Sequence, residues 1–295
     1  MAGERRPGGA AGPPAAAEVL LLPSGRLRFE RVGQGPPLVM VHGLLGSGAQ
    51  WRAAARVLGA HVTCWLLELP GISLSDAIPD ATLPGLRVWL EQALAALGLE
   101  RFALMGASWG GRLAMDYALH SPRRGQIERL VLVAPAHPYW SPSRRQRFLL
   151  QPAVARVGAW LGARLPPAVY RALLGPAYGD PRRIRPVNVA DYRAIFQVAG
   201  LGEALVGYGR DWRGDQVRLR AGLAQAPAAL QAKTLLVWGE RDQIVPLATA
   251  AELCAAWPQA QLRLLPGLGH IPFDEDPAAF GAAVLPFLCP PGDCR

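Results

Sequence analysis

The sequence predicts an α/β fold, in which a mostly parallel, doubly wound sheet has helices on both faces and carries an inserted helical cap. Short apolar runs recur along the chain without polar alternation, which is typical of strands buried on both faces. Helix-like segments separate these runs, and this alternation favours parallel pairing. One long stretch, residues 137–232, has several helix-like pieces and no convincing strand, which indicates an insertion lying over the site.

The predicted elements follow one another in a regular order. Residues 19–22 and 27–32 predict a β-hairpin at a sheet edge, because Pro23-Ser24-Gly25 separates them. Buried strands are expected at residues 38–41, 62–67, just before Gly106, and at 130–133, 234–237 and 262–265. Helices are expected around 51–58, at 83–97 with Gly98 as the stop, after Gly110, and at 278–288 with a break near Pro286.

These elements divide the chain into a tail, a core and a cap. Residues 1–17 are rich in Gly, Pro and Ala and predict a disordered tail, whereas residues 18–136 and 233–295 form the expected core around the cap at 137–232. No apolar run reaches the ~18 residues of a transmembrane helix. Glu18 and Pro23 interrupt the only stretch that approaches a signal peptide, so we expect a cytoplasmic protein.

The four cysteines fit that location. Cys64 and Cys254 lie in apolar runs and are expected to be buried thiols. Cys289 and Cys294 flank Pro-Pro-Gly-Asp and are near enough in sequence to pair, but a reduced tail is the favoured interpretation. No spacing typical of zinc ligands is present, so no metal site is expected.

Positive charge is concentrated in the predicted cap. The chain has a net charge of +9, and residues 137–232 contain fourteen arginines against five acidic residues, a surplus equal to that of the whole chain. Such a surplus can attract an anionic substrate, a membrane surface or an anionic partner. We favour the simpler interpretation that these arginines cover helix surfaces with their apolar stems. Nucleic acid is not an expected partner, because the arginines are scattered and no binding motif is present.

The motif around which the chain is organised is Gly106-Ala107-Ser108-Trp109-Gly110. It follows an apolar run and precedes a helix-like segment, so it predicts a strand, a sharp turn and a helix. Such a turn holds the serine in a sparsely populated conformation, while the glycines let strand and helix approach closely. This is the pattern of a nucleophile elbow, G-x-S-x-G. The pentapeptide alone is equally compatible with a glycine-rich turn and an N-cap serine.

An acid and a histidine follow the serine at two later strand ends. Asp242 comes after the run at 234–237, and His270 lies in a glycine-flanked loop after the run at 262–265. The order serine, acid, histidine is the one that accompanies a nucleophile elbow. In such a triad the acid fixes the histidine tautomer and the histidine takes the serine proton.

Other residues compete for these roles. Glu240 is a rival acid in the same loop as Asp242, and Asp76 and Asp274 are weaker rivals. The remaining histidines are expected outside the chemistry: His42 as a structural residue of an oxyanion-type loop, His61 before a strand, and His120 and His137 at surface or cap positions.

From residue 19 to residue 288 the chain resembles the α/β-hydrolase superfamily. The matching motifs are His42-Gly43 after a strand, the elbow at 106–110, the acid loop at 239–246 and Gly269-His270. The loop HGLLGSGAQW is most similar to that of small-ester hydrolases, while Ser-Trp-Gly is similar to proline iminopeptidases, whose Gly-Gly-Pro-Gly is missing here. The frequent Asp-x-x-Gly-x-Gly-x-Ser is also altered: Glu68 replaces Asp, Ile72 a frequent His, and Ser73 the second Gly. The substrate of any one subfamily therefore does not carry over.

The resemblance implies a serine hydrolase that acts through an acyl-enzyme. Ser108 would be the nucleophile, with His270 and Asp242 as base and orienting acid and the N–H groups of Leu44 and Trp109 as oxyanion hole. The implied substrate is a carboxylic ester, thioester or lactone of a mainly hydrophobic small molecule, with a carboxylate for the cap arginines as an option. No metal or organic cofactor is expected, and the oligomeric state is open.

Two other functions stay open at this point. The same triad can hydrolyse a carbon–carbon bond of a diketone-type substrate, and the same fold can serve as a non-catalytic ligand receptor. A serine at the elbow argues against dehalogenase or epoxide hydrolase chemistry, which in this superfamily resembles attack by an aspartate.

Overall fold

A computed structural model describes residues 17–149, 151–225 and 232–290. The predicted tail lies outside the described residues except for Ala17, which begins the first strand. Within the described residues, no helix is long and apolar enough to cross a membrane.

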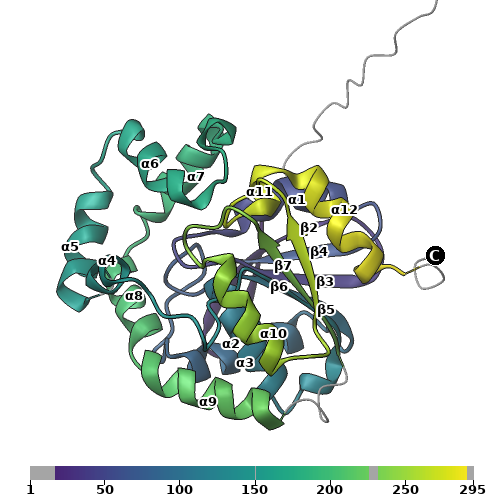
Figure 1. Ribbon diagram of the computed structural model, residues 1–295. Helices are drawn as coiled ribbons and strands as arrows, with labels where there is room; N and C mark the ends of the chain where they lie inside the picture. The colour runs from purple at the N-terminus through teal and green to yellow at the C-terminus, as the bar shows by residue number, and fades with distance from the viewer. Residues whose placement is uncertain (1–16, 150, 226–231, 291–295) are drawn as a thin grey trace, which may run out of the picture.

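Eight strands form one sheet in the order β1-β2-β4-β3-β5-β6-β7-β8 (Figure 1). Their bounds are β1 Ala17–Leu22, β2 Gly25–Val32, β3 Pro37–Val41, β4 Thr63–Leu67, β5 Phe102–Ala107, β6 Ile127–Val133, β7 Lys233–Gly239 and β8 Gln261–Leu265. β1 and β2 form the predicted edge hairpin, and β2 is antiparallel to β4, whereas all other neighbours are parallel. The mostly parallel sheet is thus confirmed, and the carboxyl ends of β3 to β8 meet at one edge.

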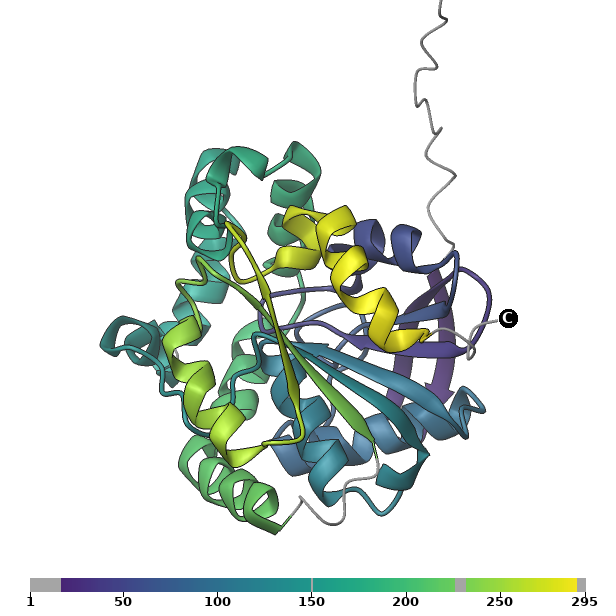
Figure 2. The same cartoon turned by 45° about the vertical axis from the view of Figure 1, so that its right-hand side comes forward.

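Helices cover both faces of this sheet, as the absence of polar alternation in the strands predicts (Figure 2). The core helices are α1 Arg52–Leu58, α2 Leu83–Ala96, α3 Trp109–His120, α10 Ala250–Ala256, α11 Pro272–Glu275 and α12 Pro277–Leu288. Short 3-10 helices span Gly48–Trp51, Arg124–Gln126, Gly175–Ala177, Pro181–Arg183 and Leu247–Thr249. Alternate residues of β3 point to opposite faces: Val39 and Val41 pack in the cluster of α2, α3 and α10, and Leu38 and Met40 in that of α1 and α12.

Six helices lie between β6 and β7 and form the insertion. They are α4 Arg144–Leu149, α5 Pro152–Gly162, α6 Pro167–Leu174, α7 Pro186–Ile195, α8 Leu201–Gly209 and α9 Trp212–Gln225. Figure 1 shows α4 to α8 beside the carboxyl edge of the sheet, whereas α9 returns along α3 to the core. A helical insertion is therefore confirmed.

Arg112 of α3 anchors α9 to the core. Its guanidinium is fully buried, donates to the carbonyl oxygen of Ala136 at 3.0 Å, and stacks on the Trp212 ring at 4.0 Å. Burial lowers the pKa of Arg112 to about 10, although the negative charge of Asp215 at 3.8 Å acts in the opposite direction. The guanidinium therefore stays charged at neutral pH. The insertion is fixed to the core by a buried charge at this point.

Three local expectations are wrong. Helix α12 passes through Pro286 without a break, because a proline in the last turn removes a single backbone donor while Val284 and Leu288 stay packed. Cys254 is only partly buried, although it packs against the edge of the core cluster. Cys289 is disulfide-bonded rather than reduced; Cys294 lies outside the described residues.

Candidate active site

Ser108 occupies a strained turn between β5 and α3. Its φ and ψ angles are 52° and −116°, in a region that residues with a side chain rarely adopt. A Cβ at Gly106 would lie 2.3 Å from the Gly110 carbonyl oxygen, and a Cβ at Gly110 would lie 2.3 Å from that of His42. Only glycines let strand, helix and neighbouring loop approach this closely. The turn thus has the geometry of a nucleophile elbow.

Asp242 and His270 meet at the ends of β7 and β8. The Nδ1–H of His270 donates to Oδ2 of Asp242 at 2.8 Å, and both side chains are buried. The other oxygen, Oδ1, accepts the backbone N–H groups of Ile244 at 2.8 Å and Val245 at 2.9 Å. With the carboxylate held on both oxygens, the imidazole is fixed with its proton on Nδ1, which leaves the Nε2 lone pair free to take a proton.

The rival acids are occupied elsewhere. Glu240 is exposed and accepts the Gly267 N–H, and Asp76 pairs with Arg26 at the surface. Asp274 is buried, but Tyr178, Arg185 and Asn188 use its oxygens. Among the described acids, only Asp242 is hydrogen-bonded to His270.

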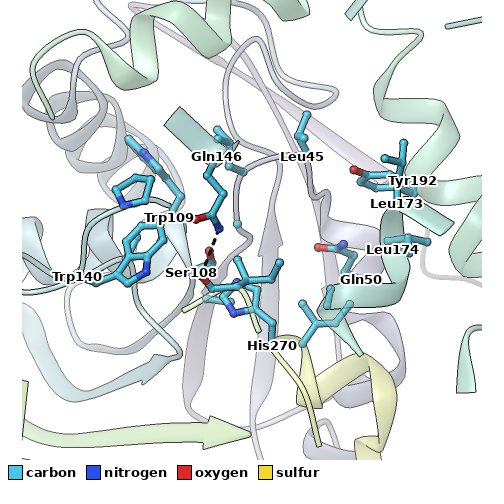
Figure 3. A pocket seen from close by; sticks show the side chains of 18 of the residues that line it. Leu45, Gln50, Ser108, Trp109, Trp140, Gln146, Leu173, Leu174, Tyr192 and His270 are labelled. Atoms are coloured by element: carbon cyan, nitrogen blue, oxygen red, sulfur yellow. Dashed lines mark hydrogen bonds between the residues drawn. The ribbon is translucent and has the colours of Figure 1, made fainter. Parts of the chain in front are cut away.

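Ser108 and His270 line one pocket, shown in Figure 3. Within the described residues, the Ser108 hydroxyl is not hydrogen-bonded to the imidazole. Such contacts are often long in ligand-free enzymes and shorten when substrate binds. The two groups therefore line the same pocket.

Two backbone N–H groups flank the serine. Trp109 is the first residue of α3, so its N–H has no acceptor within the helix. The Leu44 N–H donates to no described acceptor. The loop carrying Leu44 lies against the serine, because a Cβ at Gly43 would be 3.0 Å from Ser108 Cβ and 3.6 Å from its Oγ. Both amides that the sequence singled out are thus unpaired and adjacent to Ser108.

His42 is fully buried and supports this loop through two hydrogen bonds. Its Nδ1 donates to the Gly43 carbonyl oxygen at 2.9 Å, and its Nε2 accepts the Leu69 N–H at 3.0 Å. The bond that Nε2 accepts requires the neutral ring, and desolvation lowers the pKa of His42 to about 4. The expectation of a structural role for this residue agrees with its contacts.

Glu68 holds the far end of the same loop. One oxygen of its buried carboxyl group accepts the Gly48 N–H at 3.1 Å and bonds to the Ser73 hydroxyl. Burial raises the pKa of Glu68 to about 7. His42 Nε2 lies 3.7 Å from this group, but between pH 4 and 7 both side chains are largely neutral, so the contact is not an ion pair.

The pocket is mostly apolar and has a volume of about 280 Å³. Core and insertion both supply its wall. The core contributes Gly43, Leu44, Leu45, Gln50, Ala107, Ser108, Trp109, Ala136, Ile244, His270, Ile271 and Phe273, and the insertion contributes Trp140, Pro142, Gln146, Leu173, Leu174, Ala177, Tyr192 and Trp212. None of these residues is an arginine, a lysine or an acid. Figure 3 shows Gln50 and Tyr192 on the side opposite Trp109 and Trp140.

Sequence reasoning missed a clamp that joins the insertion to the His270 loop. The buried carboxylate of Glu275 accepts the N–H groups of Gly179 at 2.9 Å, Asp180 at 2.9 Å and Gly269 at 2.8 Å. The His270 N–H itself donates to the carbonyl oxygen of Ala177 at 2.8 Å. Three consecutive acids, Asp274 to Asp276, soon after the histidine were the available signal.

Of the two histidines expected at surface or cap positions, one is buried and one is partly exposed. His137, expected at a surface or cap position, is fully buried because its Nε2 bonds to the Thr249 hydroxyl at 2.9 Å and its ring packs on Trp238. His120 is partly exposed and bonds to Asp116 at 3.0 Å, in agreement with the expectation.

Comparison with known proteins identifies the family. Residues 36–277 match the model of the alpha/beta hydrolase fold. This chain belongs to the α/β-hydrolase family. Its relatives in this family include enzymes named for different hydrolytic reactions.

Curated α/β-hydrolase relatives include an esterase and a carbon–carbon bond hydrolase. The pimeloyl-[acyl-carrier protein] methyl ester esterase of Aeromonas salmonicida is 31% identical over 267 residues, which cover 88% of this chain and 98% of the relative. The 2-hydroxy-6-oxo-6-phenylhexa-2,4-dienoate hydrolase of Burkholderia cepacia is 26% identical, with 89% and 90% covered. Among solved structures, Cfl2 of Burkholderia cenocepacia has a TM-score of 0.80 at 20% identity, with 92% and 95% covered, which shows the shared fold.

Proposed function

We propose that this protein is a serine hydrolase that transfers an acyl group to Ser108 and then to water. The observation that supports it most is the Asp242–His270 hydrogen bond at the edge of a pocket into which the strained Ser108 turn also opens. His270 Nε2 takes the hydroxyl proton as Ser108 Oγ attacks the carbonyl carbon. It then returns the proton to the leaving group, and a water molecule repeats the sequence on the acyl-enzyme.

The Leu44 and Trp109 N–H groups receive the developing oxyanion. Both are backbone donors in rigid segments, so they are oriented before the reaction begins. In other hydrolases one such donor contributes about 3–4 kcal/mol. The Asp242 carboxylate stabilises the imidazolium that forms between the two steps.

Labelling with a fluorophosphonate, which reacts with activated serines, tests this mechanism. We expect the native protein to be labelled, Ser108→Ala to show no labelling, and His270→Ala to react about 10³-fold more slowly. Ser141→Ala, which changes an exposed serine, is the control and should react like the native protein. Absence of labelling in folded native protein would contradict the proposal and favour a ligand receptor.

The pocket lining supports a neutral, hydrophobic substrate: an ester, a thioester or a lactone. A carboxylate in this pocket would lose its hydration without gaining a cationic partner, because no arginine or lysine lines the wall. The same argument disfavours a dienoate of the kind named for the Burkholderia cepacia relative. The apolar lining therefore favours ester cleavage over carbon–carbon bond cleavage.

A matched pair of substrates tests this preference. We expect kcat/KM for p-nitrophenyl butyrate to exceed that for the p-nitrophenyl monoester of succinate by about 10²-fold or more, because only the second carries a charge into the pocket. Equal values would refute the neutral-substrate proposal without affecting the mechanism. Turnover of a dienoate in preference to both esters would favour the carbon–carbon bond hydrolase.

A further inference from the structure

Helix α5 lies at the outer edge of the insertion (Figure 1), and three of its apolar side chains form an exposed stripe. Val157, Trp160 and Leu161 are all exposed, Trp160 by 59% and Val157 by 55%. At 3.6 residues per turn these three side chains fall within about 100° of the helix circumference. The opposite side of α5, with Ala155 and Gly162, is buried against the rest of the insertion. The stripe is therefore the solvent face of an amphipathic helix.

The surroundings of this stripe are basic. Residues 137–179 contain six arginines and no aspartate or glutamate. The Arg164 guanidinium stacks on the Trp160 ring at 4.1 Å, so a cation lies directly beside the stripe. Arg144 and Arg147 of α4 are exposed and have no ion-pair partner among the described residues, and Phe148 next to them is exposed as well.

Several other arginines of the insertion have partners within the protein. Arg185 and Arg218 pair with Asp274 and Asp116, and Arg220 donates to the Pro138 carbonyl oxygen. These side chains agree with the simpler interpretation given above, in which the arginines cover helix surfaces and join neighbouring segments. Among the described residues, Arg193, Arg210 and Arg213 also have no ion-pair partner, so Arg144, Arg147 and Arg164 are distinguished only by their position on or next to the helices α4 and α5 that border the apolar stripe.

We propose that this face of α4 and α5 docks on an anionic lipid surface. Val157, Trp160 and Leu161 would enter the boundary between headgroups and acyl chains, while Arg144, Arg147 and Arg164 contact lipid phosphates. An acidic protein fits the charge but leaves the apolar stripe without a partner. A second copy of this chain fits the stripe but brings two basic surfaces together.

The docking face is joined to the pocket wall. The Tyr170 hydroxyl of α6 bonds to the Gly162 carbonyl oxygen at the end of α5, and Leu173 of the same helix is both exposed and part of the pocket lining. A hydrophobic substrate dissolved in the bilayer would thus meet the pocket from the docked side. This route rests on the proposed hydrolase function, whereas the docking itself does not.

Flotation with lipid vesicles tests the docking directly. We expect the full chain to bind vesicles of equal parts phosphatidylglycerol and phosphatidylcholine at least tenfold more tightly than pure phosphatidylcholine, and less tightly at high salt. Replacing Val157, Trp160 and Leu161 together by Gln should weaken binding at least tenfold. Arg144→Gln with Arg147→Gln should weaken it about fivefold per arginine.

Matched variants elsewhere on the surface serve as controls. Leu21, Val88 and Val217 are exposed apolar residues outside the stripe, and their replacement by Gln should leave binding unchanged. The same holds for Arg56→Gln with Arg123→Gln, two exposed arginines away from α4 and α5. Trp160→Phe should keep most of the binding but lose quenching of tryptophan fluorescence by brominated lipid.

Three results would overturn the proposal. The first is a native protein that does not bind the anionic vesicles, or a stripe variant that binds as tightly as the native chain. The second is a native dimer that the stripe variant converts to a monomer, seen by analytical ultracentrifugation, which would assign the stripe to a second copy. The third is binding of poly-glutamate in place of vesicles, which would assign the arginines to an acidic protein. Ser108→Ala should bind vesicles like the native chain, so failure of the hydrolase mechanism is seen separately.

Discussion

Two buried residues that hold the loop at residues 43–48, Glu68 and His42, give the stability of the fold opposite dependences on pH. The folded-state pKa of Glu68 is about 7, against an ordinary value of 4.5. As pH rises through this window the unfolded chain releases the proton and the folded chain keeps it, so stability falls. The pKa of His42 is about 4, against 6.5, so stability falls as pH drops through that window.

Glu68→Gln isolates the first of these effects. A glutamine mimics the protonated acid but does not titrate, so the variant should gain stability relative to the native chain as pH rises from 5 to 7.5. The gain should be about 2–3 kcal/mol, since 1 pKa unit corresponds to about 1.4 kcal/mol. Urea unfolding at both pH values measures it. Glu100→Gln, an exposed control, should show no such gain, and the same pH slope in native and Glu68→Gln protein would refute the account.

At the scale of elements, the loop after β8 is shaped by the insertion as much as by the sheet. Glu275 collects N–H groups from two insertion residues, Gly179 and Asp180, and from Gly269 beside the proposed base. A displacement of about 1 Å at a reacting group can cost about 10² in rate. Glu275 is therefore a positioning residue, which acts on His270 through the backbone.

Glu275→Gln tests this coupling between elements. The amide NH₂ would face donors where the carboxylate accepts, so we expect fluorophosphonate labelling of Ser108 to slow by about 10²-fold. Hydrogen exchange should rise together in residues 177–180 and 267–271. The neighbouring Asp276→Asn, which also removes one negative charge but keeps the α12 N-cap, is the control. Unchanged labelling and exchange in Glu275→Gln would show that the clamp does not position the base.

Elements set by local patterns could be predicted from the sequence, and contacts between distant segments could not. The buried strands, the elbow and the order of Ser108, Asp242 and His270 follow from apolar runs and from the residues at strand ends. The burial of His137 depends on Trp238 and Thr249, core residues that follow the insertion in the sequence, and the clamp at Glu275 joins the insertion to the loop of His270. The expected break at Pro286 does not occur, because packing of the last turn of α12 outweighs one lost hydrogen bond.

For the molecule as a whole, charge and pocket are separated. The cationic surplus of the insertion lies on its helices, whereas the pocket lining carries no arginine or lysine. The net charge of the insertion therefore predicts that its surface is positive, but it does not predict that the pocket below is apolar. The expectation that arginines meet a substrate carboxylate finds no support in the lining residues.

The two halves of the site also come into existence at different times during protein synthesis. Ser108 lies before the insertion and Asp242 and His270 lie after it, so the ribosome makes the serine first and the residues that would activate it much later. Until then Ser108 is an ordinary alcohol at the end of an incomplete sheet. A nascent chain that stops within the insertion would carry the nucleophile without its base, and would therefore be chemically silent.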